Sequence, residues 1–237
     1  SGNKIVEGIR PASRFPFQDH RHEKLLDTLT RNIIMTSSVR ETDIVHCHTW
    51  YTHLAGCLIK EIFVIPLVIT THSLEPQRPW KEEQPGSAYR ASTWIEKTAY
   101  QNADGVIAVS QSMKIGVHDL YQVPFEKIRV ILNGIDVHRY QPTLNPAVLR
   151  LYHINPDKPF ILFVGRISRQ KGIIHLISAI KYLLSGTQIV LRAGAPDTEE
   201  IGKEMTERVE EAQTQTQNDI IWIRQWIPKS DLIVLYS

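Results

Sequence analysis

The feature of this sequence that most constrains its fold is an alternation of short apolar runs with stretches of helical character. The apolar runs lie at residues 42–50, 67–72, 105–110, 127–134, 159–165, 187–194 and 219–223. Most of them are unbroken rather than alternating in polarity, which is typical of parallel strands buried on both faces. We therefore expect an α/β fold in which helices cover parallel sheets.

The composition changes between the first four runs and the last three. Residues 135–158 contain three prolines and few strand-forming residues, which indicates a linker with one short helix. We expect a partial N-terminal Rossmann-like lobe at 1–140, a linker at 141–158 and a partial C-terminal lobe at 159–237. Because the chain begins without Met and stops on an apolar pattern, we expect an internal fragment of a longer protein.

Composition narrows the possible partners. Hydrophobic residues make up 42% of the chain and the formal net charge is +2, so a normal core is expected and nucleic-acid binding is disfavoured. The two cysteines, Cys47 and Cys57, are too few for a disulfide framework and favour a reduced, cytoplasmic setting. No apolar run is long enough to span a bilayer, so we expect no membrane partner.

The segment VGRISRQKGI, residues 164–173, concentrates positive charge where a strand is expected to end. Ligands of open parallel sheets bind at the carboxyl ends of the strands, and Gly165 permits a sharp turn there. A helix expected from Gly172 onward would present free N–H groups, to which Arg166 and Lys171 add two full charges. This pattern predicts a site for a diphosphate, in particular a diphosphate leaving group. A solvated basic turn is the alternative.

Two common nucleotide motifs do not fit the same segment. The glycines are wrongly spaced for the Gly-x-Gly-x-x-Gly turn of dinucleotide-binding proteins. A P-loop requires Gly-Lys followed by Ser or Thr, whereas Lys171 precedes Gly172 here.

Several segments together resemble a known family. They are FVGRISRQKGIIHLISAI, HTWYTHLAG, THSLEPQRPWK, YRASTWIEKTAYQNADGVIAVSQSM and VILNGID, and they are similar to bacterial glycogen synthases of the ADP-glucose-using type. The resemblance implies glycosyltransferase family 4 and the GT-B fold, with two Rossmann-like lobes facing each other across a cleft. It implies an ADP-glucose donor held mainly by the second lobe, an α-glucan acceptor held by the first, and no cofactor. By this match Arg166 and Lys171 hold the diphosphate.

Other strand ends supply further candidates for the donor site. His72 ends the run 67–72, and in the resembled family the matching histidine lies beside the donor sugar, where a neutral ring can bind a hydroxyl. A histidine satisfied by backbone groups is the alternative. Ser110 ends the run 105–110 and is expected at the cleft edge. Gly194 ends the run 187–194, where a glycine allows close approach of a nucleotide.

The segment HCHTWYTH, residues 46–53, suggests a metal site at first sight. His46 and His48 share one face of a strand, but no convincing further set of zinc ligands exists, so we expect no metal. His48 and Trp50 are instead expected to line the acceptor or sugar site, where aromatic rings pack on sugars. Core packing is equally open for both.

The loop at residues 73–87 is the most specific part of the resemblance, because it is long and belongs to no generic fold. Glu75, Arg78 and Trp80 within it are expected to recognise the acceptor or a sugar, and a mobile surface loop is the alternative. Glu96, in the helix expected after this loop, has the pattern of a surface residue.

The function implied by the resemblance is retaining transfer of glucose from ADP-glucose to the end of an α-1,4-glucan. No protein nucleophile is needed, because a leaving-group oxygen takes the acceptor's proton while Arg166 and Lys171 stabilise the departing charge. The family's glycine-rich loop and its pair of glutamates are missing here, so we expect weak activity or none. Synthesis of maltose 1-phosphate from ADP-glucose and glucose 1-phosphate is one alternative, and a non-catalytic nucleotide- or glucan-binding module is another.

Overall fold

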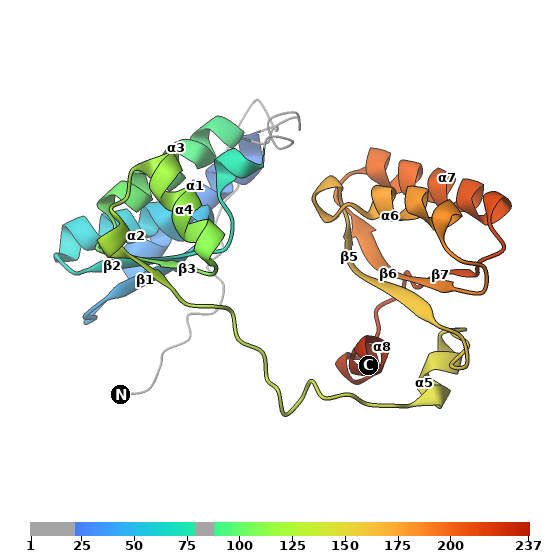
Figure 1. Ribbon diagram of the computed structural model, residues 1–237. Helices are drawn as coiled ribbons and strands as arrows, with labels where there is room; N and C mark the ends of the chain where they lie inside the picture. Colours follow the sequence, from blue (N-terminus) through green and yellow to red (C-terminus); the bar gives the residue numbers. More distant parts are fainter. Residues whose placement is uncertain (1–21, 79–87) are drawn as a thin grey trace. The chain divides into compact units, whose positions relative to one another are not determined.

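The structure is a computed structural model, and it describes residues 22–78 and 88–237. The chain divides into two compact units, the first ending at Gly134 and the second running from Ile135 to Ser237. Each unit has its own parallel sheet, as Figure 1 shows. Among the described residues, no helix has the length and apolar character needed to cross a membrane.

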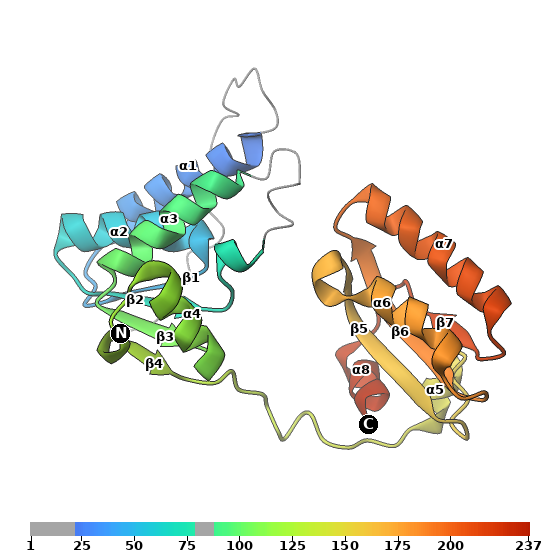
Figure 2. The same ribbon diagram turned by 45° about the horizontal axis from the view of Figure 1, so that its top comes forward.

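The first unit alternates helices with strands along the chain. Its elements are α1 (Glu23–Ser38), β1 (Val45–His48), α2 (Trp50–Phe63), β2 (Leu67–Thr71), η2 (Glu75–Gln77), α3 (Tyr89–Asn102), β3 (Gly105–Ala108), α4 (Gln111–Tyr121), η4 (Phe125–Lys127) and β4 (Ile128–Val130). The strands are all parallel in the order β1-β2-β3-β4. Because parallel crossovers are right-handed and all step in one direction, α2, α3 and α4 lie on the same face. Figures 1 and 2 show these helices, with α1 beside α2, on one side of the sheet.

The two faces of this first sheet differ. Leu67, Ile69 and Val106 point toward the helices and are almost fully buried. His46 and His48 lie on the other face and are exposed, and no described helix covers them. The expectation that every strand is buried on both faces is therefore wrong for β1. Its sequence VHCH alternates in polarity, so that only every second side chain can enter the core.

The second unit is built around a three-stranded sheet of order β5-β6-β7. Its elements are α5 (Pro146–Leu151), β5 (Phe160–Ile167), η5 (Arg169–Lys171), α6 (Ile173–Ala179), η6 (Ile180–Tyr182), β6 (Gln188–Pro196), α7 (Glu199–Gln215), β7 (Ile220–Trp222) and α8 (Lys229–Tyr236). Helices α6 and α7 cover one face, and α5 and α8 cover the other (Figure 2). Both faces of β6 are buried, because Leu191 packs with the first pair of helices and Val190 with the second.

The start of the basic segment differs from the sequence-based expectation. Strand β5 continues through Arg166 to Ile167, and its pairing with β6 shifts register between Gly165 and Ile167. Gly165 therefore lies at an irregularity inside the strand, and the turn begins at Ser168. The helix that follows, α6, ends at Ala179, and a 3-10 turn at Ile180–Tyr182 continues it.

Candidate functional site

The carboxyl edge of the second sheet brings together the glycines that the sequence singled out. Gly165 pairs with Ala193, so Gly194 follows immediately on the neighbouring strand. A Cβ added to Gly165 would lie 3.2 Å from the Phe163 ring and 3.8 Å from the Lys171 side chain. The Lys171 side chain therefore packs beside Gly165, and only a residue without a side chain leaves this space open.

The two predicted phosphate ligands differ in their contacts. Arg166 is 60% exposed in its side chain, and its Nη1 donates to Oδ1 of Asp197 at 2.5 Å. Lys171 is exposed and forms no ion pair within the part of the chain that the structure describes. Arg169, between them, approaches Glu204 at 3.6 Å. The edge thus holds two paired guanidinium groups, those of Arg166 and Arg169, and the ammonium of Lys171, which can receive an anion.

Ser168 is a residue of this edge that the sequence reasoning missed. It lies between Arg166 and Lys171, is 2% exposed, and its Oγ has no hydrogen-bond partner among the described residues. A buried hydroxyl without a partner costs about 1–3 kcal/mol. Nothing in the sequence separates this serine from others in turns, because its burial depends on the turn geometry.

The carboxyl edge of the first sheet carries a pair of imidazoles. Nδ1 of His48 lies 3.0 Å from Nε2 of His72, and the two rings stack with centroids 5.3 Å apart. His46 lies next to His48, and the centroids of the two rings are 4.5 Å apart. Nε2 of His46 is 2.7 Å from Oγ1 of Thr70. Burial lowers the pKa of His48, and the neighbouring His46 and His72 lower it further. The neutral form of the His48 ring is therefore favoured, and a neutral ring can bind a sugar hydroxyl.

The backbone directly after His48 is strained. Thr49 has a φ of +64° and a ψ of 158°, a conformation that a β-branched residue rarely adopts. Such residues cost about 1–3 kcal/mol and concentrate at functional sites. Thr52 stabilises the turn, since its hydroxyl donates to the carbonyl of His48 at 3.0 Å and its N–H to that of Thr49 at 3.1 Å.

Trp50 does not line an open surface. It is 8% exposed, stacks on Tyr51 with centroids 4.4 Å apart, and its Nε1 is buried with no partner in the described residues. Because α2 begins at Trp50, the ring belongs to the helix layer rather than to the strand end. Of the two possibilities that the sequence left open, the structure favours core packing.

Ser110 has a local structural contact. Its Oγ accepts the N–H of Met113 at 3.1 Å, which caps the start of α4. A second contact joins it to Oγ of Ser112 at 3.1 Å. A role of Ser110 in donor binding stays a prediction.

Of the loop residues predicted to recognise a sugar, Glu75 is buried in a hydrogen-bond network and Arg78 is half-buried beside it. Glu75 is 1% exposed; its carboxylate accepts from Ser92 at 2.9 Å and from Arg78 at 3.3 Å. Trp80 lies outside the described residues. Glu96, expected on the surface, is 2% exposed, so that expectation is wrong. It accepts hydrogen bonds from Tyr121 and from the N–H of Glu75, partners that helical periodicity cannot reveal.

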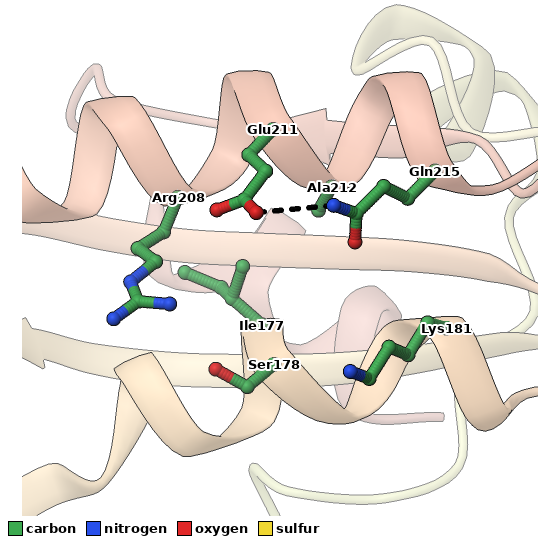
Figure 3. Close-up of a pocket in the computed structure, with 7 residues that line it drawn as sticks. All are labelled: Ile177, Ser178, Lys181, Arg208, Glu211, Ala212 and Gln215. Atoms are coloured by element: carbon green, nitrogen blue, oxygen red, sulfur yellow. Dashed lines mark hydrogen bonds between the residues drawn. The ribbon is translucent and has the colours of Figure 1, made fainter.

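A shallow pocket of about 80 Å³ lies elsewhere, between α6 and α7 (Figure 3). It is lined by Ile177, Ser178, Lys181, Arg208, Glu211, Ala212 and Gln215. None of the residues predicted from the sequence contributes to it. Within residues 22–78 and 88–237, no group of three or more His, Cys, Asp and Glu side chains could hold a metal ion.

Comparison with known proteins finds sequence relatives among sugar-transferring enzymes. Alpha-maltose-1-phosphate synthase of Mycolicibacterium smegmatis is 40% identical over 86% of this chain and 53% of that protein. Glycogen synthase of Mycobacterium tuberculosis is 29% identical over 60% of this chain and 32% of that protein. The crystal structure of Anabaena Alr3699/HepE in complex with UDP-glucose superposes with a TM-score of 0.66 at 19% identity, covering 86% of this chain and 53% of that one.

These matches establish the fold and the family. The chain spans about half the length of the maltose-1-phosphate synthases that it matches. The structural likeness shows that its parallel α/β sheets are those of GT-B glycosyltransferases. The model of the family described as Glycosyltransferase Family 4 matches residues 3–139, more than half of the chain. The chain therefore belongs to glycosyltransferase family 4.

Proposed function

We propose that this chain is part of a retaining glucosyltransferase that transfers glucose from ADP-glucose to glucose 1-phosphate and forms α-maltose 1-phosphate. The observation that carries this proposal is the 40% identity to an alpha-maltose-1-phosphate synthase over 86% of the chain. The likeness to a glycogen synthase, on which the sequence reasoning relied, is weaker at 29% over 60% of the chain. Maltose 1-phosphate synthesis, which the sequence left as an alternative, is thus the better supported reaction.

The edge with Gly165, Arg166, Ser168 and Lys171 is the proposed diphosphate site. The contact of Arg166 with Asp197 is largely exposed, and exposed ion pairs contribute about 0–1 kcal/mol, so a diphosphate can replace Asp197. Lys171 adds a charge that no described acid neutralises. The Ser168 hydroxyl can donate to a phosphate oxygen, which supports a ligand at this turn. Gly194 is the proposed point of close approach for the nucleotide, and a Cβ added there would lie 3.6 Å from Nη1 of Arg192.

The proposed reaction needs no protein nucleophile. The bond from the anomeric carbon to the diphosphate breaks, and the acceptor hydroxyl attacks from the same face while a diphosphate oxygen takes its proton. Arg166 and Lys171 stabilise the charge that develops on the leaving group. His72, held beside His48, is proposed to bind a hydroxyl of the donor glucose. Arg78 and Trp80 stay candidates for acceptor recognition.

The acceptor decides between the proposed reaction and glucan extension. We expect the full-length protein that contains this chain, given ADP-glucose, to release ADP faster with glucose 1-phosphate than with glycogen, with maltose 1-phosphate as the product. Transfer of glucose to glycogen alone would favour glycogen synthase activity. Binding of ADP without turnover on either acceptor would favour a non-catalytic nucleotide-binding module.

The phosphate site is tested with matched substitutions in one turn. Lys171→Gln is expected to lower turnover about 100-fold or more, since loss of one charge-stabilising donor typically costs that much. It should also weaken ADP binding, measured by calorimetry, by at least about tenfold, which corresponds to 1.4 kcal/mol. Arg169→Gln, which removes a nearby cation that contacts Glu204, is the control and should change both values by less than about twofold. Equal effects of the two substitutions would contradict the site.

A further inference from the structure

Helix α3 carries a buried polar stripe that the sequence did not predict. Ser92, Glu96 and Tyr100 are spaced four residues apart, so they lie on one face of the helix. Their exposed fractions are 1%, 2% and 1%. Charged side chains are almost never buried this fully unless they are paired, so the stripe requires a structural reason.

The partners of the stripe lie on both sides of His72. The hydroxyl of Tyr100 donates to Oγ1 of Thr71 at 2.7 Å. The carboxylate of Glu96 accepts the N–H of Glu75 at 2.7 Å, and Ser92 donates to the Glu75 carboxylate at 2.9 Å. Thr71 immediately precedes His72, and Glu75 follows it by three residues. The stripe therefore binds both ends of the turn that carries His72.

Tyr121 of helix α4 contacts two residues of the stripe. Its ring stacks on that of Tyr100 with centroids 4.8 Å apart and an interplanar angle of 13°, and its hydroxyl donates to Glu96. Burial, followed by the charge of Glu96, raises the pKa of both tyrosines. Both hydroxyls consequently remain protonated donors, and the network keeps one arrangement.

We propose that Ser92, Glu96 and Tyr100 are positioning residues that hold the turn after β2 so that the His72 ring stays against His48 and faces the donor sugar. The part concerning the sugar rests on the proposed function, whereas the restraint on His72 does not. A ring at the open end of a strand samples several rotamers unless its backbone is fixed. A functional group must be held near its productive geometry by supporting contacts of this kind.

The bond between Tyr100 and Thr71 is tested with a double-mutant cycle. The variants are Tyr100→Phe, Thr71→Val and the two combined, and the readout is the ring-nitrogen NMR signals of His72 and His48. Each single variant is expected to shift the His72 signals, and the double variant should add nothing further, because all three lack the same bond. Tyr152→Phe, which removes a buried tyrosine hydroxyl from the second unit, is the control and should leave these signals unchanged.

The bond from Glu75 to Glu96 is tested by a pair of substitutions at one position. Glu96→Gln keeps an oxygen that can accept the N–H of Glu75, whereas Glu96→Leu removes it. Exchange of the Glu75 amide hydrogen should stay within about threefold of wild type in the first variant and accelerate at least about tenfold in the second. If Glu96→Leu fails to fold, the cycle at Tyr100 and Thr71 still decides the proposal.

The outcomes separate this proposal from the proposed function. Unchanged His72 signals in folded Tyr100→Phe, or additive shifts in the double variant, would overturn the positioning role. If the signals respond as expected, Tyr100→Phe should also lower turnover with ADP-glucose about tenfold to a hundredfold, as a misplaced group does. If they respond but His72→Ala turns over like wild type, the positioning stands and the role of His72 in the reaction fails.

Discussion

The two sheets of this chain are built on the same parallel pattern but are covered differently. The β5–β7 sheet has helices on both faces, and its central strand buries Val190 on one side and Leu191 on the other. The β1–β4 sheet has all its described helices on one face, and its other face carries His46 and His48. The candidate groups of both sheets lie at the carboxyl edge, although helices cover both faces of the second sheet. The helices that the structure describes leave one face of the first sheet uncovered, and we call it the open face.

The difference between the two sheets shows that the pairing of a strand within its sheet does not determine how far its side chains are buried. Hydrogen bonding between the strands depends on the backbone and is of the parallel type in both units. Burial depends on which side chains alternate along the strand: β1 has imidazoles on one of its faces, whereas β6 has buried apolar side chains on both. Among the described residues the histidines of the open face are exposed, whereas the two covered faces of the second sheet contribute mainly stability.

The largest expected effects compare matched residues on the two faces of each sheet. Ile69→Ala and Leu191→Ala should each lower the free energy of unfolding by about 3 kcal/mol, since both side chains are fully buried. Val190→Ala should cost about 2 kcal/mol, whereas Val68→Ala, on the open face, should cost less than about 1 kcal/mol. Urea unfolding of each variant measures these values. Equal costs for Val68 and Val190 would show that the open face is covered in solution.

A smaller effect concerns acid. His53 of α2 is 1% exposed, its ring nitrogens have no partner among the described residues, and burial lowers its pKa to about 3. Because the unfolded chain binds this proton near pH 6.5, the contribution is complete above that pH. It is lost at about 1.4 kcal/mol per pH unit as the pH falls toward 3. The first unit should thus lose about 2 kcal/mol between pH 6.5 and 5.

The acid effect is measured by urea unfolding at both pH values, with NMR signals reporting each unit separately. The second unit serves as an internal comparison, because its His153 and His175 are exposed. His53→Leu should remove most of the pH dependence of the first unit between pH 6.5 and 5. An unchanged pH dependence in that variant would show that another group is responsible.

The smallest expected effect concerns the second helix layer of the second unit. Tyr152 donates to Oδ2 of Asp231 at 2.7 Å and so joins the end of α5 to α8. Tyr152→Phe should lower the free energy of unfolding by about 1 kcal/mol at pH 8. Tyr182→Phe, at a position 79% exposed, is the control and should change it by less than about 0.5 kcal/mol. Similar losses for the two would mean that the contact does not stabilise this layer.

Most elements of the fold could be predicted from the sequence alone. The expected strands at 67–72 and 187–194 correspond to β2 and β6 within two residues at each end, because apolar runs bounded by polar turns are local patterns. The extension of β5 through Arg166 could not be predicted. It depends on pairing with β6, which continues to Pro196, where it pairs with Ile167 of β5.

The candidate site was predictable only in part. Strand ends are visible in the sequence, so Arg166, Lys171 and His72 could be named before the structure was known. The closeness of His48 to His72 follows from the register of β1 and β2, which aligns His48 with Thr70. Burial of Ser168 and Glu96 depends on neighbours that are distant in the chain or on turn geometry, and no periodic pattern encodes either.

By itself, the sequence determined the class of fold and the residues that end its strands, because hydrophobic periodicity and turn chemistry act over a few neighbouring residues. Tertiary structure alone decided which of those residues meet, which faces of the two sheets the helices cover, and which polar side chains are buried. The physical reason is that a hydrogen bond such as that between Tyr100 and Thr71 joins groups 29 residues apart. Its energy depends on a geometry that only the packed chain provides.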